Sequence, residues 1–204
     1  MFEDELDDTE DIIKYTKKYM PVNATNDKLG WLAPSFNLLD VSENYFSLDQ
    51  LKGDNGTVIV FICNHCPYVI AIAERLSFEA EELKKISINT IAIMSNDVNQ
   101  YPEDSYDNMK LFSKKYNFNF HYLYDETQKV AKSFGAICTP DIFGFNSSLE
   151  LQYRGRIDSG VMNSNNSKIK RELYIAMNKI KNDGIGPKEQ LNSFGCSIKW
   201  KNNE

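Results

Sequence analysis

The sequence predicts an α/β protein whose central mixed sheet is flanked by helices. Residues 57–63 (TVIVFIC) form a continuously apolar, β-branched run, which is typical of a strand buried on both faces of a sheet. Helical patterns of apolar residues alternate with further short apolar runs. Late in the chain, two strand patterns flank the turn sequence Asn146-Ser147-Ser148 and predict a β-hairpin. The alternation indicates a layered sheet, to which the hairpin adds an antiparallel edge.

Each predicted strand is a short apolar or β-branched run bounded by turn-forming residues. The pattern predicts strands over residues 36–39, 57–63, 90–95, 120–124, 141–145 and 151–156, with another short element around residues 46–51. The runs at 57–63 and 90–95 carry the most continuous apolar character. They indicate buried strands near the centre of the sheet.

Each predicted helix carries apolar residues along one face. The pattern predicts helices over residues 68–85, 104–116, 127–134 and 167–181. Pro67 stands at the first turn of the first helix, where its missing N–H costs little. Gly135 and Gly184 follow the last two helices, and glycine is common just past a helix end.

The length of 204 residues predicts one domain with short extensions. Acidic residues crowd the beginning of the chain, MFEDELDDTED. We expect an acidic N-terminal extension over residues 1–33, with a short helix at Asp11–Tyr19. The domain itself is predicted over residues 34–182, and a C-terminal tail over residues 183–204.

Charge and hydropathy argue against two classes of partner. The net charge of −6 argues against nucleic-acid binding, which needs a basic surface. No apolar run approaches the roughly 18–20 residues of a membrane span. The acidic start also differs from a signal peptide, which is basic and then apolar. We therefore expect a soluble, cytoplasmic protein that binds neither nucleic acid nor membrane.

Two of the four cysteines, Cys63 and Cys66, form a C-x-x-C motif between a predicted strand and a predicted helix. A helix start offers unpaired N–H groups and partial positive charge, which favour a thiolate. Protonated His65 would add to this effect. Since the thiolate is the nucleophile in disulfide exchange, we expect Cys63 to attack a disulfide and Cys66, one turn into the helix, to resolve it.

Two other interpretations of the motif stay open. Zinc usually requires four ligands, whereas the further candidates, Cys138, Cys196, His65 and His121, are not spaced as a pair. The two cysteines could also be unreactive core residues. The redox interpretation predicts that neither a metal nor an organic cofactor is needed.

The dipeptide Thr139-Pro140 precedes the predicted strand at 141–145. Proline belongs at a strand start, because inside a central strand it would remove a ladder hydrogen bond. A Thr-Pro bond here is a candidate cis peptide facing the start of the cysteine helix. An ordinary trans proline is the alternative.

Three further residues have weaker assignments. Cys138 is either a third redox cysteine or a small buried hydrophobe. Cys196, in the tail, either exchanges with Cys63, pairs between two chains, or is a packed or free thiol. Arg156 either binds a peroxide through its guanidinium or lies on the surface.

The segments VIVFICNHCP and GAICTPDIFGF resemble the thioredoxin-like superfamily over roughly residues 34–181. The lead APSFNLLD…FSLDQLKG resembles its AhpC/TSA (redoxin) branch. CNHCPYV, TPDIFGF, YRGRID and GCSIKW are closest to peroxiredoxin-like proteins of unassigned function in that branch. The resemblance implies a thioredoxin-like fold, with Cys63 as nucleophile and Cys66 as resolving cysteine. It also implies that Pro140 is a cis-proline and that the backbone of Thr139 docks an extended substrate.

The chain departs from both family patterns. Ile62 and Thr57 stand where thioredoxins carry a tryptophan and a buried acid, so the usual proton relay is missing. Peroxiredoxins place the peroxidatic cysteine at the position of Cys66, and the threonine and proline that precede it are here Cys63 and Ile59.

Three functions follow as hypotheses. The first is a thiol–disulfide oxidoreductase that uses Cys63 and Cys66 on a protein or small-molecule disulfide and serves redox homeostasis. The second is a thiol peroxidase of the redoxin type, acting on peroxide through a sulfenic acid. The third is a non-catalytic thioredoxin-like binding module.

Overall fold

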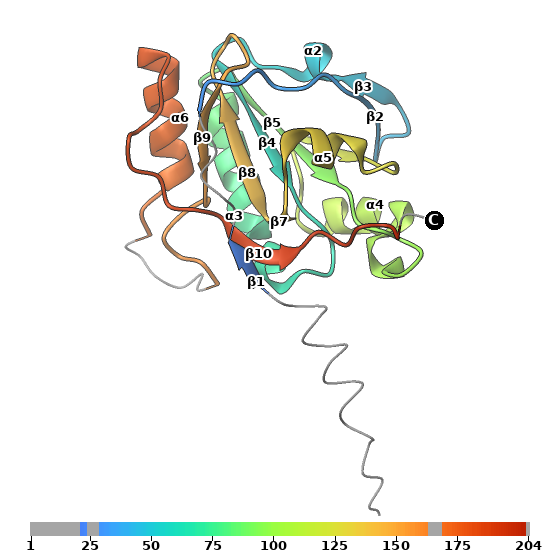
Figure 1. Ribbon diagram of the computed structural model, residues 1–204. Coiled ribbons are helices and arrows are strands. Elements are labelled where there is room, and N and C mark those ends of the chain that lie inside the picture. Colours follow the sequence, from blue (N-terminus) through green and yellow to red (C-terminus); the bar gives the residue numbers. More distant parts are fainter. Residues whose placement is uncertain (1–20, 24–28, 163–168, 203–204) are drawn as a thin grey trace, which may run out of the picture.

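The computed structural model describes residues 21–23, 29–162 and 169–202, and its centre is a mixed sheet (Figure 1). Its strands are β2 (Asn37–Asp40), β3 (Tyr45–Ser47), β4 (Gly56–Phe61), β5 (Ile88–Met94), β6 (His121–Tyr124), β8 (Asp141–Phe145) and β9 (Leu151–Gly155). The seven strands lie in the order β3-β2-β6-β5-β4-β8-β9. β5 pairs in parallel with β4 and β6, and the other pairings are antiparallel.

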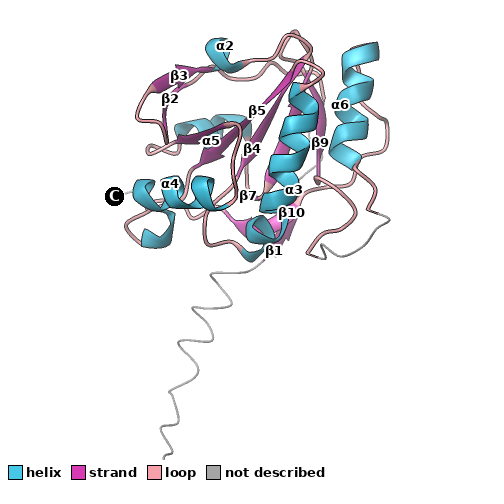
Figure 2. Ribbon diagram, turned by 180° about the vertical axis from the view of Figure 1, so that it is seen from behind, coloured by secondary structure: helices cyan, strands magenta, loops and turns pink. Residues whose placement is uncertain are grey.

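Helices cover both faces of this sheet. They are α2 (Leu48–Leu51), α3 (Pro67–Lys84), α4 (Tyr106–Lys115), α5 (Lys129–Phe134) and α6 (Glu172–Asp183), with a 3-10 turn η1 (Pro102–Asp104). α3 and α6 lie on one face and α5 on the other, as the two opposite views show (Figures 1 and 2).

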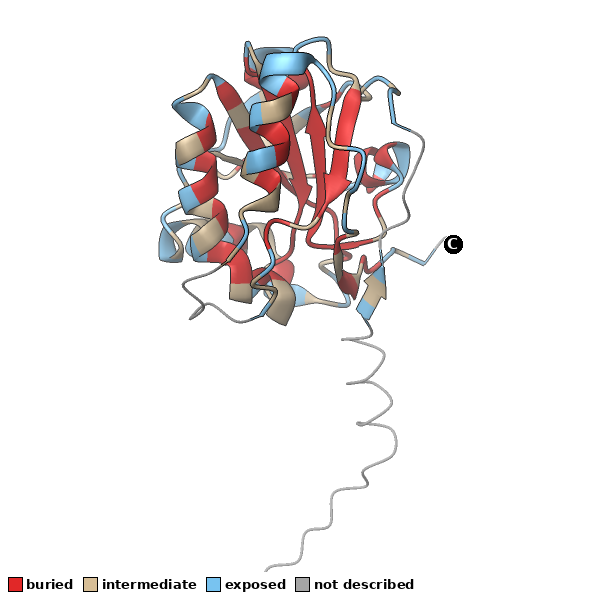
Figure 3. Ribbon diagram, turned by 90° about the vertical axis from the view of Figure 1, so that its left-hand side faces the viewer, coloured by how far each residue is buried: buried red, intermediate tan, exposed pale blue. Residues whose placement is uncertain are grey.

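The alternation of side chains along β4 explains the two layers, because successive residues of a strand point to opposite faces. Val58 and Val60 pack in the cluster that contains Leu76 of α3. Ile59 and Phe61 pack in the second cluster, with the α5 helix. Both faces of the central strands are therefore buried (Figure 3).

A second, smaller sheet joins segments that lie far apart in the sequence. β1 (Pro21–Asn23), β10 (Phe194–Ser197) and β7 (Cys138–Thr139) form a three-stranded antiparallel sheet in the order β1-β10-β7. It lies beside the amino end of α3 (Figures 1 and 2). Residues from the predicted N-terminal extension and C-terminal tail thus build the surroundings of the C-x-x-C motif.

The structure confirms the predicted elements of the central sheet and its helices, with shifts of a few residues at their ends. The last helix begins at Glu172, and the predicted start at Ser167 lies outside the described residues, as does the predicted helix at Asp11–Tyr19. Among the helices of the described residues, none combines the length and hydropathy needed to cross a lipid bilayer.

A buried ion pair holds the beginning of β8 next to the Thr139-Pro140 peptide. Arg154 of β9 donates from Nη2 to Asp141 Oδ2 at 2.9 Å and to the carbonyl of Gly135 at 2.8 Å. The side chains of Arg154 and Asp141 are 2% and 0% exposed. Removing one partner of such a pair leaves the other charge buried and uncompensated.

Arg154→Met is expected to lower the free energy of unfolding by about 3–5 kcal/mol, because it leaves the Asp141 carboxylate buried without its guanidinium. Urea denaturation followed by circular dichroism measures the change. The matched control is Lys52→Met, which breaks the exposed pair with Asp49 and should cost less than about 1 kcal/mol. Equal losses in the two variants would contradict this account.

Candidate active site

The C-x-x-C segment leaves the sheet after β4 and enters α3. β4 ends at Phe61 and α3 begins at Pro67, with Cys66 as the residue that caps the helix. Cys66 therefore lies at the amino end of the helix, and Cys63 lies in the preceding loop. This corrects the prediction that Cys63 occupies the helix start and Cys66 the turn inside it.

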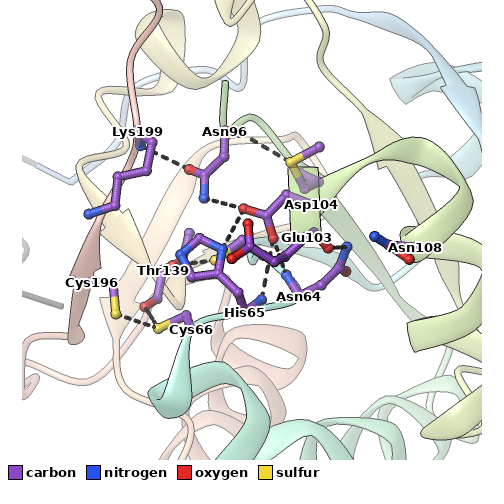
Figure 4. A network of polar contacts seen from close by, with 12 residues as sticks. Asn64, His65, Cys66, Asn96, Glu103, Asp104, Asn108, Thr139, Cys196 and Lys199 are labelled. Carbon is purple, nitrogen blue, oxygen red and sulfur yellow. Dashed lines mark hydrogen bonds and ion pairs between the residues drawn. The ribbon is translucent and has the colours of Figure 1, made fainter. Parts of the chain in front are cut away.

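The carboxylate of Asp104 explains the loop (Figure 4). Its Oδ1 accepts hydrogen bonds from the backbone N–H groups of Asn64 at 2.8 Å and His65 at 3.3 Å, which therefore do not join the helix. Its Oδ2 accepts from Asn96 Nδ2 at 2.8 Å. Asp104 is fully buried. Sequence reasoning treated residue 104 as the first of a helix, and an acid at a helix start gives no sign of such a role.

His65 lies against the same carboxylate. Its Nδ1 is 2.7 Å from Asp104 Oδ2, and its ring stacks on Tyr101 at a centroid distance of 5.5 Å. A donor nitrogen of His65 also lies within 4.8 Å of the sulfur of Cys63. The predicted support of a Cys63 thiolate by His65 is offset, because any positive charge on the imidazole faces the negative charge of Asp104.

The thiol of Cys63 is sealed from solvent. The residue is 1% exposed, and its Sγ lies 3.3 Å from Thr139 Oγ1. Burial raises the pKa of the Cys63 thiol well above its usual value, and the hydrogen bond with Cys66 and the charge of Asp104 act in the same direction. This direction is opposite to the predicted acidity of the Cys63 thiol.

Cys66 is the sulfur with the most hydrogen-bond donors around it. Burial acts to raise the pKa of the Cys66 thiol, but hydrogen bonds from the thiols of Cys196 and Cys63 and the N–H groups of Cys196 and Val69 outweigh it, and the pKa is lowered. When protonated, Cys66 donates to the carbonyl of Thr139 at 3.1 Å. Its position at a helix start adds partial positive charge, so thiolate character belongs to Cys66.

The Thr139-Pro140 peptide bond is cis and faces the cysteines, as the sequence predicted. The hydroxyl of Thr139 contacts Cys63, and its carbonyl contacts Cys66. Thr139 thus touches both sulfurs of the C-x-x-C motif.

The tail strand β10 brings Cys196 into the same cluster. Cys196 pairs across the ladder with Thr139, and its Sγ lies 2.9 Å from Cys66 Sγ (Figure 4). A side chain at Gly195 would place its Cβ 2.0 Å from the carbonyl oxygen of Thr139, so only glycine allows this approach. Sequence reasoning left Cys196 open, and the structure groups it with Cys63 and Cys66.

Lys199, which sequence reasoning missed, adds a cation to this cluster. It is 7% exposed, and its Nζ lies 3.1 Å from Ser197 Oγ. Burial lowers the pKa of Lys199, while the cysteine thiols and Asp104 favour its charged form. A lysine in a polar tail gives no indication in the sequence that it will be buried beside thiols.

Two candidates lie apart from the sulfur cluster. Cys138 is buried, and its thiol lies 3.6 Å from the carbonyl of Pro140. Because it neighbours Thr139 in β7, its side chain points to the opposite face. Arg156 binds Glu172 through Nε at 2.5 Å and Nη2 at 3.0 Å, and it lines a small hollow beside Pro140.

Cys63, His65 and Asp104 offer donor atoms within 4.8 Å of one another, close enough to share a metal ion. Both oxygens of Asp104 already take part in the loop hydrogen bonds and in the contact with His65. A metal would have to displace these contacts. We therefore assign the three residues to the hydrogen-bond network rather than to a metal site.

Comparisons with known proteins show which family and which fold the chain resembles. The sequence profile of the AhpC/TSA family matches residues 29–174. A chloroplastic peroxiredoxin Q from Populus jackii is 29% identical over 115 residues, which are 56% of this chain and 49% of that protein. The chain spans about half the length of the curated relatives that it matches.

Solved structures match over more of the chain. An uncharacterized conserved protein from Geobacillus kaustophilus has a TM-score of 0.85 and 40% identity, covering 90% of this chain and 98% of that one. A hypothetical protein from Sinorhizobium meliloti 1021 has a TM-score of 0.84 and 31% identity, covering 89% and 99%. The thioredoxin domain of a Bacteroides vulgatus thiol-disulfide oxidoreductase shares the fold at 14% identity and a TM-score of 0.54, covering 63% and 89%. The predicted thioredoxin-like α/β fold is confirmed.

At neutral pH, the reduced protein is expected to carry a thiolate at Cys66, because hydrogen bonds hold the pKa of Cys66 below the ordinary value of about 8.5. The ultraviolet absorbance of this thiolate should therefore persist in the folded protein as the pH falls below about 8.5. In urea, where the hydrogen bonds of the folded site are absent, the absorbance should be lost near that pH.

Cys66→Ser should remove this absorbance, whereas the matched control Cys138→Ser should retain it. Loss in Cys63→Ser combined with retention in Cys66→Ser would contradict the assignment.

Proposed function

This chain belongs to the AhpC/TSA family, and from that premise we propose that it is a thiol–disulfide oxidoreductase that cycles Cys63 and Cys66 between a dithiol and a disulfide. The observation that carries the proposal is the placement of both sulfurs against Thr139, beside the cis peptide at Pro140 and the start of α3. Cys63 Sγ lies 3.3 Å from the Thr139 hydroxyl, and Cys66 Sγ lies 3.1 Å from the Thr139 carbonyl. Because Cys66 lies at the start of α3 and Cys63 lies in the loop before it, we assign the attack to Cys66 and the resolving step to Cys63, the reverse of the roles that the family resemblance implied.

The proposed reaction balances without a cofactor. The Cys66 thiolate attacks one sulfur of a substrate disulfide, forming a mixed disulfide while the other substrate sulfur leaves as a thiolate and takes up a proton. Cys63 then loses its proton and attacks the Cys66 sulfur. The second substrate thiol leaves, and a Cys63–Cys66 disulfide remains until an external dithiol reduces it.

The pair of His65 and Asp104 fits the proton transfer in the second step. Burial keeps the Cys63 thiol protonated, so resolution requires a base near that sulfur. A nitrogen of His65 lies within 4.8 Å of Cys63 Sγ, a separation over which one bridging water would pass the proton, and Asp104 orients the imidazole through Nδ1. In this proposal the pair replaces the relay acid, for which the chain has Thr57.

The closed site favours small substrates. Cys63 and Cys66 are 1% and 0% exposed, and β10 lies against the Thr139 backbone that would dock an extended substrate. A low-molecular-weight disulfide therefore requires a smaller opening of this site than a folded protein does.

The same burial and the helix-cap position of Cys66 favour a thiol peroxidase as the second candidate. There the Cys66 thiolate attacks a hydroperoxide oxygen, the O–O bond breaks, and the alkoxide or hydroxide takes up a proton. Attack by Cys63 on the resulting sulfenic acid releases water and forms the same disulfide. The peroxiredoxin Q relatives support this reaction class by name.

Cys63→Ser is expected to stop turnover while the substrate half stays bound to Cys66, because the resolving thiol is missing. Cys66→Ser is expected to abolish both turnover and adduct formation. Intact-protein mass spectrometry after one equivalent of a small aromatic disulfide measures the adduct, and reduction of that disulfide by dithiothreitol measures turnover.

The same variants separate the candidate functions. If Cys63→Ser forms a sulfenic acid at Cys66 after treatment with a hydroperoxide but does not react with disulfides, the peroxidase replaces the oxidoreductase as the function. Unchanged turnover in Cys66→Ser would contradict both. Failure of the unaltered protein to react with either substrate would leave a non-catalytic binding module.

A further inference from the structure

The tail strand β10 holds a third thiol in bonding reach of the C-x-x-C motif. Cys196 Sγ lies 2.9 Å from Cys66 Sγ, whereas a disulfide bond measures about 2.05 Å. The two sulfurs would therefore need to approach by less than about 1 Å to bond. The two residues are 130 positions apart in the sequence, so this contact is a product of the tertiary fold.

Contacts on both sides of Cys196 hold it in position. On one side of it, Gly195 permits close approach to the Thr139 carbonyl. On the other side, the backbone N–H of Lys199 donates to Asn96 Oδ1 at 2.9 Å, and the N–H of Asp97 donates to the Lys199 carbonyl at 2.8 Å. These bonds fix the register of the strand, so Cys196 faces Cys66.

The surroundings of Cys196 also differ from those of an inert core cysteine. Its side chain contacts another thiol, and the buried cation of Lys199 interacts electrostatically with all three sulfurs of the cluster. Cys138, in contrast, points away from this cluster and contacts a carbonyl oxygen. The chain therefore offers an internal comparison between a clustered and a separate buried cysteine.

We propose that Cys196 is the third redox cysteine of this site and takes over the disulfide by bonding to Cys66. The proposal rests on the proposed Cys63–Cys66 redox function. Cys196 loses its proton and attacks the Cys66 sulfur of the Cys63–Cys66 disulfide. The Cys66–Cys196 bond forms, the Cys63–Cys66 bond breaks, and Cys63 leaves as a thiolate that takes up a proton. No electrons are gained or lost in this exchange.

The exchange has two consequences for the protein. Cys63 returns to the thiol form, and the disulfide is retained between Cys66 and Cys196 of the tail. The new bond also joins β10 covalently to the start of α3, which closes a long loop and constrains the unfolded chain. The oxidised protein should therefore unfold at a higher temperature than the reduced protein.

Oxidation of the full-length protein by diamide, followed by non-reducing peptide mapping, tests the proposal. We expect a Cys66–Cys196 cross-link in the unaltered chain and, more completely, in Cys63→Ser. Cys196→Ser should lose this cross-link and the associated rise in melting temperature. Cys138→Ser is the matched control and should keep both.

Absence of the cross-link in a folded Cys63→Ser protein would overturn the proposal, as would a cross-link between Cys196 and Cys138. Circular dichroism of each reduced variant verifies folding, and Cys63→Ala serves where Cys63→Ser fails to fold. Turnover that requires Cys66 and Cys63 but forms no bond to Cys196 would refute this inference while leaving the proposed function intact. A Cys66–Cys196 cross-link without any turnover would support this inference and contradict the proposed function.

Discussion

The sulfur of Cys66 is the point on which this site depends, because three separate segments meet there. It caps α3, contacts the Thr139 carbonyl beside the cis peptide, and lies against Cys196 of β10. A buried thiolate is costly unless donors surround it. Cys63, Cys196 and two backbone N–H groups supply those donors, so the acidity of this thiol is a property of the assembled fold.

The Asp104 carboxylate shapes the opposite side of the site. By binding the N–H groups of Asn64 and His65, it holds the loop out of the helix and leaves Cys66 at the helix start. The same negative charge disfavours a thiolate at Cys63. The charge of Asp104 thus adds to burial and to the hydrogen bond with Cys66 in raising the pKa of Cys63, while other donors lower the pKa of Cys66. The resulting difference between the two thiols is the asymmetry that sequential disulfide exchange requires.

Patterns in the sequence predicted the central sheet because its signals are local. The apolar run of β4, the proline at the start of α3 and the turn of the β8–β9 hairpin each specify structure within a few residues. The Thr139-Pro140 peptide was predicted for the same reason. The three-stranded sheet was missed, because the segments around Cys196 and Val22 lack an apolar repeat and pair only through tertiary contacts. The order of thiol acidity was missed too, since its donors come from the distant tail.

The most direct test of this account is a crystal structure of the protein after oxidation by diamide. The account predicts that Cys66 is in every disulfide of the site, bonded either to Cys63 or to Cys196, with a sulfur–sulfur distance of about 2.05 Å. An oxidised structure in which Cys66 stays a free thiol while Cys63 bonds another partner would contradict it.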